Sequence, residues 1–422
     1  MRRRRHNHAA LSLETAVLRT RPFDVILYGA SGFVGRQTAR YFAAHAPGLR
    51  WAVAGRSAVK LEALRSALAE ASPGLVVADA ADAAALDTLA AQARVVLSSA
   101  GPFARFGSEL VAACVRHGTH YVDITGETPW VRQMIDRHHA AAAASGTRIV
   151  PGCGFDSVPS DLGTWLVARA LREQHDEACV SVKACFSIKG GLNGGTAASM
   201  LHALEDGVQG QIDDPFLLNP AGSAPADAAR HRDPAGALRD ADFDAWLAPF
   251  VMGPINTRVV RRSAALLAGS GLYAPAFHYQ EYARIGRGTP GALGATAVAV
   301  GMAAGRTALG IAPLRRLAAR YLPAPGEGPS ERAMDRGSFR CELIGVGSRG
   351  TLQRGRIAGC GDPGNRATTV FVCESALALA LDARRLPGGA RFGGVLTPAV
   401  AFGAVLAARL RAAGMAVAPF SS

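Results

Sequence analysis

Lysine is almost absent from this chain of 422 residues, in which it occurs only at Lys60, Lys183 and Lys189. The formal net charge is nevertheless +13, so nearly all of the positive charge comes from arginine. Together with abundant alanine, this bias is more typical of GC-rich coding sequence than of selection for a polyanionic partner. The chain also lacks a basic stripe interleaved with aromatic residues and any nucleic-acid motif. We therefore expect no nucleic acid partner.

The chain also lacks the cysteine spacing of a disulfide framework or a zinc site. Its seven cysteines are odd in number, and no two of them form a C-x-x-C pair. We expect no metal site and a reducing, cytoplasmic compartment. A composition of 49% hydrophobic and 19% charged residues is globular, and the length favours two domains.

Residues 1–22 lack the uninterrupted apolar core of a secretory signal, because polar residues recur through them. Four consecutive arginines, Arg2 to Arg5, leave an organellar transit peptide as an alternative, but Glu14 counts against it. We expect a disordered basic leader. Whether it belongs to the mature protein stays open.

From Phe23 to Pro151, short apolar runs alternate with helical patterns. The expected strands lie at 23–28, 50–54, 75–78, 95–98, 120–124 and 148–150, and the expected helices at 36–45, 59–70, 83–91, 108–117 and 131–145. Six strands joined by short helices predict a Rossmann-type, doubly wound parallel sheet in an α/β domain. Ligands of such a sheet gather beyond the carboxyl ends of its strands.

The stretch GASGFVG directly follows the first expected strand. The 48 glycines of the chain make this spacing common, so the context has to decide. A strand precedes the stretch and a helix follows it, and free N–H groups at such a helix N-terminus bind a diphosphate. The alternative is a tight turn in a purely structural βα unit. The residues that we assign to dinucleotide binding are Gly29, Ala30, Ser31, Gly32, Phe33, Val34 and Gly35.

The end of the second strand indicates which dinucleotide is bound. Many dinucleotide folds place an acid here to bind the ribose 2′-hydroxyl, whereas this chain has Arg56 and Ser57, with Lys60 one turn later. A guanidinium can grip a 2′-phosphate that a carboxylate would repel. The sequence therefore favours NADP (NADPH), although Arg56 as a solvated surface residue is the alternative.

Three further loops are expected at the same edge of the sheet. The candidate cofactor residues in the first two loops are Ser99, Ala100, Gly101, Pro102, Phe103, Thr125 and Gly126. The third loop spans 151–161. In it, Ser157 or Asp161 is expected to cap the helix 162–171.

None of the polar residues in these loops is assigned a catalytic role. We expect Asp123 to fix loop backbone rather than to donate protons. Cys153 is expected to be a small buried residue rather than a reactive one.

The second half of the chain alternates in the β manner at 179–188, 258–267, 339–346 and 351–358, and the last pair predicts a hairpin. We expect an α+β domain on a largely antiparallel sheet, with mobile loops at 215–254 and 323–329. The glycine-rich stretch 190–199 is either a plain turn or a helix N-terminus, running through His202 and Leu204, that faces the substrate. The domains that we expect are 1–22, the leader; 23–160, the NADP-binding domain; 161–392, the substrate or dimerisation domain; and 393–422, a helix that packs back on the first domain.

Residues 288–305 contain no charge. We expect a buried or interfacial helix rich in small residues, with a peripheral lipid contact as the alternative.

Six motifs occur in order along the chain: GASGFVG, AGRS-x-x-KL, SSAGPFARFG, HYVDITGE, PGCGFDSVPSDLG and GGVLTPA. Together they resemble the saccharopine dehydrogenase-like oxidoreductases, and most closely the branch of the mycobacterial trans-acting enoyl reductases, over about 23–205 and 367–413. The resemblance implies an NADP-binding N-terminal fold and reduction of a double bond in a polyketide-derived lipid held by a partner synthase. The stretch 362–367 departs from the family pattern, and no arginine cluster for a dicarboxylate substrate is evident.

The first functional hypothesis is therefore an NADP-dependent reductase acting on a small-molecule or carrier-bound acyl or lipid substrate, with a polyketide synthase as partner. The alternatives are an imine or amino-acid dehydrogenase of saccharopine type and a non-catalytic NADP-binding, lipid-associated protein. The absence of a Tyr-x-x-x-Lys pair keeps the last alternative open. A homodimer and a peripheral membrane contact also stay open.

Overall fold

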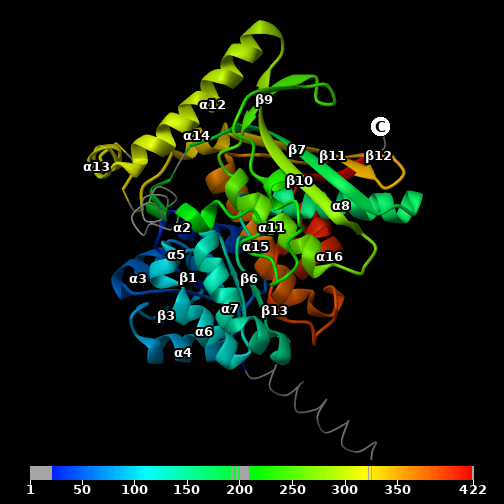
Figure 1. Ribbon diagram of the computed structural model, residues 1–422. Coiled ribbons are helices and arrows are strands. Elements are labelled where there is room, and N and C mark those ends of the chain that lie inside the picture. The colour runs from blue at the N-terminus through cyan, green and yellow to red at the C-terminus, as the bar shows by residue number, and fades with distance from the viewer. Residues whose placement is uncertain are drawn as a thin grey trace, which may run out of the picture.

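The computed structural model describes residues 21–191, 193–195, 198–199, 209–321, 323–324 and 326–420. Within these ranges, seven strands form a parallel sheet in the order β13-β6-β5-β4-β1-β2-β3 (Figure 1). Its strands are β1 (Phe23–Tyr28), β2 (Trp51–Gly55), β3 (Gly74–Val77), β4 (Ala93–Ser98), β5 (His120–Asp123), β6 (Arg148–Val150) and β13 (Gly394–Val395). The six strands expected from the sequence are present, and the seventh comes from the C-terminal region of the chain. The expected Rossmann-type fold is confirmed.

The strands of this sheet are mostly apolar because both faces are covered. Along β1, Val25 and Leu27 face one hydrophobic cluster, and Ile26 and Tyr28 face another. The helices of this part are α2 (Phe33–His45), α3 (Ala58–Ser66), α4 (Ala83–Gln92), α5 (Phe103–Phe106), α6 (Ser108–His117) and α7 (Thr128–Ser145). The switch in strand order lies between β1 and β4, so a crevice for a ligand is expected there.

A second sheet, again of seven strands in the described part of the chain, has the order β14-β12-β11-β7-β10-β9-β8. Its strands are β7 (Cys179–Lys189), β8 (Leu238–Asp240), β9 (Ala245–Pro249), β10 (Tyr273–Gly286), β11 (Ser338–Gly347), β12 (Leu352–Cys360) and β14 (Ala416–Phe420). Only β7 and β10 pair in parallel; the other pairs are antiparallel. The expected hairpin is confirmed as β11 and β12.

Helices between the two sheets join them into one body (Figure 1). The helices of the second half are α8 (Val158–His175), α10 (Gln209–Ile212), α11 (Gly253–Leu266), α12 (Gly288–Gly310), α13 (Ala312–Ala319), α14 (Glu331–Asp335), α15 (Thr368–Leu381) and α16 (Pro398–Ala412). Helix α15 packs on α2 and on β1, β4 and β5, whereas α8 packs on β7, β11, β12 and β14. One hydrophobic cluster therefore runs from the first sheet to the second.

The strand expected at 258–267 is wrong, because this segment is helix α11. Its arginines are buried rather than solvated, and the side chains of Arg258, Arg261 and Arg262 are at most 2% exposed. The mixture of arginine and valine in this segment resembles the alternation of polar and apolar residues in a half-buried strand. Pro254, in the first turn, is the helix-start signal that the strand interpretation overlooks.

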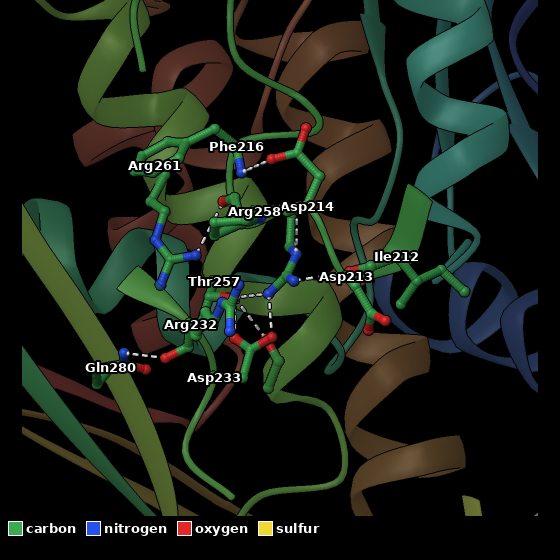
Figure 2. Close-up of polar contacts among 12 residues, drawn as sticks. Ile212, Asp213, Asp214, Phe216, Arg232, Asp233, Thr257, Arg258, Arg261 and Gln280 are labelled. Atoms are coloured by element: carbon green, nitrogen blue, oxygen red, sulfur yellow. Dashed lines mark hydrogen bonds and ion pairs between the residues drawn. The ribbon is translucent and has the colours of Figure 1, made fainter. Parts of the chain in front are cut away.

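The segment 215–254 is not the loop that the sequence suggests. It contains β8 and β9, and the arginines of α11 hold the chain just before it (Figure 2). Arg258 donates from Nε to the carbonyl of Asp214 at 3.1 Å and from Nη2 to that of Ile212 at 2.7 Å, and it pairs with Asp233. Arg261 donates to the carbonyl of Pro215 at 2.9 Å. These bonds satisfy backbone oxygens that an irregular segment would otherwise leave unpaired.

The uncharged segment 288–305 belongs to α12. Of the two positions expected for it, buried or interfacial, the buried one is wrong. Only 11% of the most apolar stretch of this helix is buried inside the protein. Among the described residues, α12 is the one helix long and apolar enough to cross a membrane by length and composition.

Candidate functional site

The glycine loop after β1 sits where β1, β2 and β4 end. Gly29 has a φ of +82°, which favours glycine, and its N–H donates to the carbonyl of Ala54 at 2.9 Å. A Cβ on Gly29 would lie 2.9 Å from the backbone nitrogen of Ala100. The ends of β1 and β4 therefore approach each other at a distance that only glycine allows.

Gly35 lets α2 start directly on this loop. A Cβ there would lie 2.3 Å from the carbonyl oxygen of Gly29 and 2.8 Å from Cα of Ala30. Any larger residue would push the helix away from the strand.

The first turn of α2 presents unused hydrogen-bond donors. Among the residues that the structure describes, no acceptor faces the N–H groups of Phe33, Val34 and Gly35, and the N-cap residue Gly32 has no side chain to supply one. No acidic side chain lies in this turn. Three free N–H groups and the positive end of the helix dipole fit a diphosphate. The loop thus has the geometry that a dinucleotide requires.

The loop after β2 carries the candidate residues for the adenosine end. Arg56 and Lys60 are exposed, and the hydroxyl of Ser57 accepts the N–H of Lys60 at 3.4 Å. The Ser57 side chain therefore caps α3. Burial raises the pKa of Tyr28, at the end of β1, to about 12, and the nearby Arg56 acts in the opposite direction. The Arg56 guanidinium has no carboxylate partner in the described part of the chain.

The loop after β4 is fixed from two sides. The hydroxyl of Ser99 donates to the carbonyl of Gly29 at 3.2 Å, which ties this loop to the glycine loop. The carboxylate of Glu127 accepts the N–H of Phe103 at 2.8 Å and that of Ala104 at 2.7 Å. The hydroxyl of Ser199 also donates to Glu127, at 2.7 Å.

Glu127 thus joins the loops after β4 and β5 to the glycine-rich stretch of the second half. No role for Glu127 is expected from the sequence. It directly precedes α7, but the N–H groups that it binds belong to the start of α5, which is more than twenty residues earlier in the chain and gives no local signal of this contact.

The loop after β5 is held by Asp123, as expected. Its Oδ1 accepts the N–H groups of Thr125 at 3.0 Å and Gly152 at 2.9 Å, and its Oδ2 accepts the hydroxyl of Tyr121 at 2.9 Å. Burial raises the pKa of Asp123 to about 7. Asp123 therefore sets the positions of the loops after β5 and β6 rather than facing solvent.

Asp156, in the loop after β6, differs from the other acids in this region. It is partly exposed, and no hydrogen bond or ion pair reaches its carboxyl from any described residue. Its Oδ2 lies 3.8 Å from the position that a Cβ on Gly126 would take. Burial raises the pKa of Asp156 to about 6. A carboxyl whose pKa is raised in this way keeps a protonated fraction closer to neutral pH than an ordinary carboxyl does, and its protonated form can serve as an acid.

A small hollow of about 20 Å³, room for about one water molecule, adjoins Gly126 at the ends of β5, β6 and β13. Its lining is mainly apolar, with a few hydroxyls and one arginine: Thr125, Gly126, Thr128, Val131, Pro151, Gly152, Ser157, Leu218, Ile255, Val259, Arg262, Val395, Leu396 and Thr397. The hydroxyl of Ser157 is buried without a partner. Arg262 is already engaged, because it donates to the carbonyls of Leu218 at 2.6 Å and Val395 at 2.7 Å.

Two expected helix caps are wrong. Helix α8 starts at Val158, and the side chain of its N-cap residue Ser157 makes no capping hydrogen bond. Asp161 lies inside α8 and accepts the N–H of Ala399 at 2.7 Å and the hydroxyl of Ser263. Asp161 therefore caps α16 instead of its own helix. Cys153 is buried as expected, and burial raises its pKa well above the usual range.

The glycine-rich stretch 190–199 packs against two other segments near the glycine loop. Gly194 donates to the carbonyl of Glu327 at 3.0 Å, and Asn193 Nδ2 donates to Asn365 Oδ1 at 2.8 Å. A Cβ on Gly328 would lie 2.5 Å from the ring of Phe33, so this neighbouring segment reaches the start of α2. His202 and Leu204, where a helix is expected, lie outside the described residues.

The stretch 362–367 forms a π-helical turn before α15, and Asp362 accepts the N–H of Arg366 at 3.0 Å. Across the described ranges, no group of three His, Cys, Asp or Glu side chains could hold a metal ion.

Residues 25–150 match the family model of the saccharopine dehydrogenase NADP binding domain. The chain is 40% identical to a Mycobacterium tuberculosis protein provisionally named as a trans-acting enoyl reductase, over 94% of this chain and 97% of that protein. A trans-acting enoyl reductase of Mycobacterium ulcerans is 39% identical over the same shares of both chains. Saccharopine dehydrogenase (L-Glu forming) of Saccharomyces cerevisiae, at 14% identity, has a similar fold, with a TM-score of 0.52 over 95% of this chain and 100% of that one.

Proposed function

Since the chain belongs to the saccharopine dehydrogenase-like oxidoreductases, the family of the trans-acting enoyl reductases, we propose that it uses NADPH to reduce the carbon–carbon double bond of an acyl or polyketide-derived substrate. The enzyme is an NAD(P)H-dependent oxidoreductase. The proposal concerns the coenzyme preference, the substrate class and the residues involved.

The observation that favours the substrate class is the mainly apolar lining beside Gly126. Apolar side chains with scattered hydroxyls suit contact with a hydrocarbon chain, and the hollow, with room for about one water molecule, would contact only part of such a chain. A dicarboxylate amino acid would need a cation to pair with, but the Arg262 guanidinium is occupied by two backbone carbonyls. This favours the enoyl substrate over a saccharopine-type imine.

In this proposal the free N–H groups of Phe33, Val34 and Gly35 hold the diphosphate, and Arg56 binds the 2′-phosphate. The loops 99–103 and 125–126 then border the rest of the coenzyme. When bound, the reduced nicotinamide supplies the hydride. A trans-acting enzyme receives its substrate from a separate synthase, so we infer a carrier-bound acyl chain and a polyketide synthase partner from the relatives' names.

We propose that Asp156 is the acid that donates the proton needed to complete the reduction. Hydride addition to the β-carbon of an enoyl thioester leaves negative charge at the α-carbon, which must then be protonated. Asp156, whose carboxyl has no partner among the described residues, lies where the loops after β5 and β6 meet and beside Gly126, which lines the hollow. Its partial exposure lets solvent restore the proton afterwards.

The activity is tested with NADPH and a short trans-2-enoyl thioester on an acyl carrier, followed by NADPH absorbance and product mass. Saturable reduction supports the proposal. Turnover with glutamate and a semialdehyde instead would establish the saccharopine-type alternative, and NADPH binding without turnover on either substrate would establish the non-catalytic one.

Asp156→Asn should lower kcat about 100- to 1,000-fold, because an amide cannot donate the proton. NADPH affinity should not change. In the wild type, kcat should fall as the pH rises through the Asp156 pKa of about 6, since the protonated form is the active one. The exposed Glu173→Gln variant is the matched control. An unchanged kcat in Asp156→Asn would remove Asp156 from the mechanism.

A further inference from the structure

Helix α12 buries small residues and exposes large apolar ones, which is the opposite of an ordinary surface helix. Its buried positions, Gly291, Ala295 and Ala299, recur every four residues and are all small. A Cβ on Gly291 would lie 2.6 Å from the backbone of Gly286, so the helix lies directly on the second sheet. The large residues point outward: Leu293 is 68% and Val300 63% exposed. A surface helix normally buries its large residues and exposes charge.

The apolar surface continues past the end of this helix. From Val300 to Gly310 no residue is buried, and Figure 1 shows α13 following at the far end of α12. Helix α13 adds exposed Leu314 and Leu317, and Tyr321 beyond it is 84% exposed. We call the outer surface of residues 288–321 the apolar arm.

The charge of the apolar arm is of one sign. From 288 to 326 the sequence contains no aspartate or glutamate, and its charged residues are Arg306, Arg315, Arg316 and Arg320. Arg306 pairs with Asp213 of the neighbouring segment. Within the described ranges, Arg316 and Arg320 have no acidic partner. Exposed leucines beside unpaired arginines are the combination that anionic lipid headgroups attract.

We propose that the apolar arm binds the surface of a membrane that contains anionic lipids. A second copy of this chain fits less well, because a symmetric contact would bring the arginines of α13 against each other. A helix that crosses the bilayer also fits less well. Arg287 at the start of α12 pairs with Asp244 at 2.9 Å, and the small-residue seam holds the helix on β9 and β10. The arm therefore lies on the membrane, and this proposal does not depend on the enzymatic activity.

The test is co-sedimentation of the full chain with vesicles of phosphatidylcholine alone or with about one third phosphatidylglycerol. Binding to the anionic vesicles that weakens as salt is added, with little binding to phosphatidylcholine, is the expected result. Val300→Asp and Leu317→Asp should each lower the partition coefficient at least about tenfold. Both side chains are exposed, so neither change should disturb folding. Leu352→Asp, at an exposed apolar residue of β12, should bind like the wild type.

The charge contribution is tested separately with Arg316→Glu. Removing one arginine near an anionic surface should lower binding about fivefold, and reversing its charge more than that. Arg384→Glu, an exposed arginine outside the arm, is the control.

Three results would overturn the proposal: wild-type binding no stronger to anionic than to neutral vesicles, arm variants that bind like the wild type, or resistance of the bound protein to alkaline extraction, which would indicate a spanning helix. A dimer in solution that Val300→Asp converts to monomer would assign the arm to a second copy instead.

Discussion

At the scale of single residues, we propose that Arg56 determines which coenzyme the site accepts. Arg56→Asp should lower NADPH affinity about 10- to 100-fold, because a charge-assisted contact to phosphate is replaced by repulsion, and should change NADH affinity much less. Calorimetric titration with both coenzymes measures this difference. Arg65→Asp, on the helix α3 that follows this loop and already paired with Glu62, should leave the preference intact. Equal losses for both coenzymes would end the argument for NADP.

Glu281 shows how a buried acid makes stability depend on pH. Its carboxylate accepts hydrogen bonds from Ser160, Tyr279 and Asn256, each at 2.8 Å, and burial raises its pKa to about 7. The folded protein keeps this proton at pH values where the unfolded chain has released it. The stabilising contribution is therefore complete below the unfolded pKa and is lost as the pH rises through the folded pKa.

The variant Glu281→Gln removes this dependence while keeping the shape of the side chain. Asn256 Oδ1 is buried without a partner, so a flipped Asn256 could accept the new amide. Relative to the wild type, the variant should gain stability between about pH 5 and about pH 7, by up to about 1.4 kcal/mol per pH unit. Urea unfolding of both proteins across this range measures the difference. A difference that does not vary with pH would show that Glu281 is ionised in the fold.

Some residues of the candidate site could be predicted from the sequence, and others could not. The glycine loop could be predicted because strand, glycine turn and helix are adjacent in the chain. Glu127 and Asp156 could not, because their roles depend on partners, or on the lack of partners, that only the folded chain defines.

At the scale of elements, the arginines of α11 hold the irregular segment of residues 212–219 by hydrogen bonds to its carbonyl groups. Arg258→Lys should destabilise the protein by about 3 kcal/mol, because one ammonium cannot replace the guanidinium bonds to Asp233 and to the carbonyls of Ile212 and Asp214. Chemical denaturation measures the loss. Arg239→Lys, on the exposed side of β8, should cost less than about 1 kcal/mol. A similar loss of unfolding free energy in both variants would show that the buried Arg258 contributes no more to stability than an exposed arginine does.

Elements were predictable where local pattern and burial agree. The strands β1, β2 and β4 are mostly apolar on both faces, and the apolar run that each contains predicts it. Helix α11 was misread because buried arginines replace the apolar residues that mark the inner face of a helix. Strand β10 was missed because it carries His278, Gln280 and Glu281 among its apolar residues. For helix α12 the sequence predicts a buried or interfacial position, because it shows a lack of charge but not which face is covered.

At the scale of the whole molecule, the two sheets share one hydrophobic cluster through α8, α15 and α16. We therefore expect thermal unfolding as a single cooperative transition rather than one for each half. NADPH should raise that whole transition, since a ligand of the native state stabilises everything that unfolds with its site. Scanning calorimetry with and without NADPH checks this. Two separated transitions, with only one moved by NADPH, would contradict it. The domain boundaries expected from the sequence stay predictions until such an experiment is done.

The positions of β13 and β14 have a consequence for biosynthesis. Both strands lie within residues 394–420, yet β13 completes the edge of one sheet beside β6 and β14 completes the edge of the other beside β12. A nascent chain still held in the ribosomal tunnel leaves both edges open, and open edges recruit other strands. Both sheets can therefore be completed only after residues 394–420 have emerged.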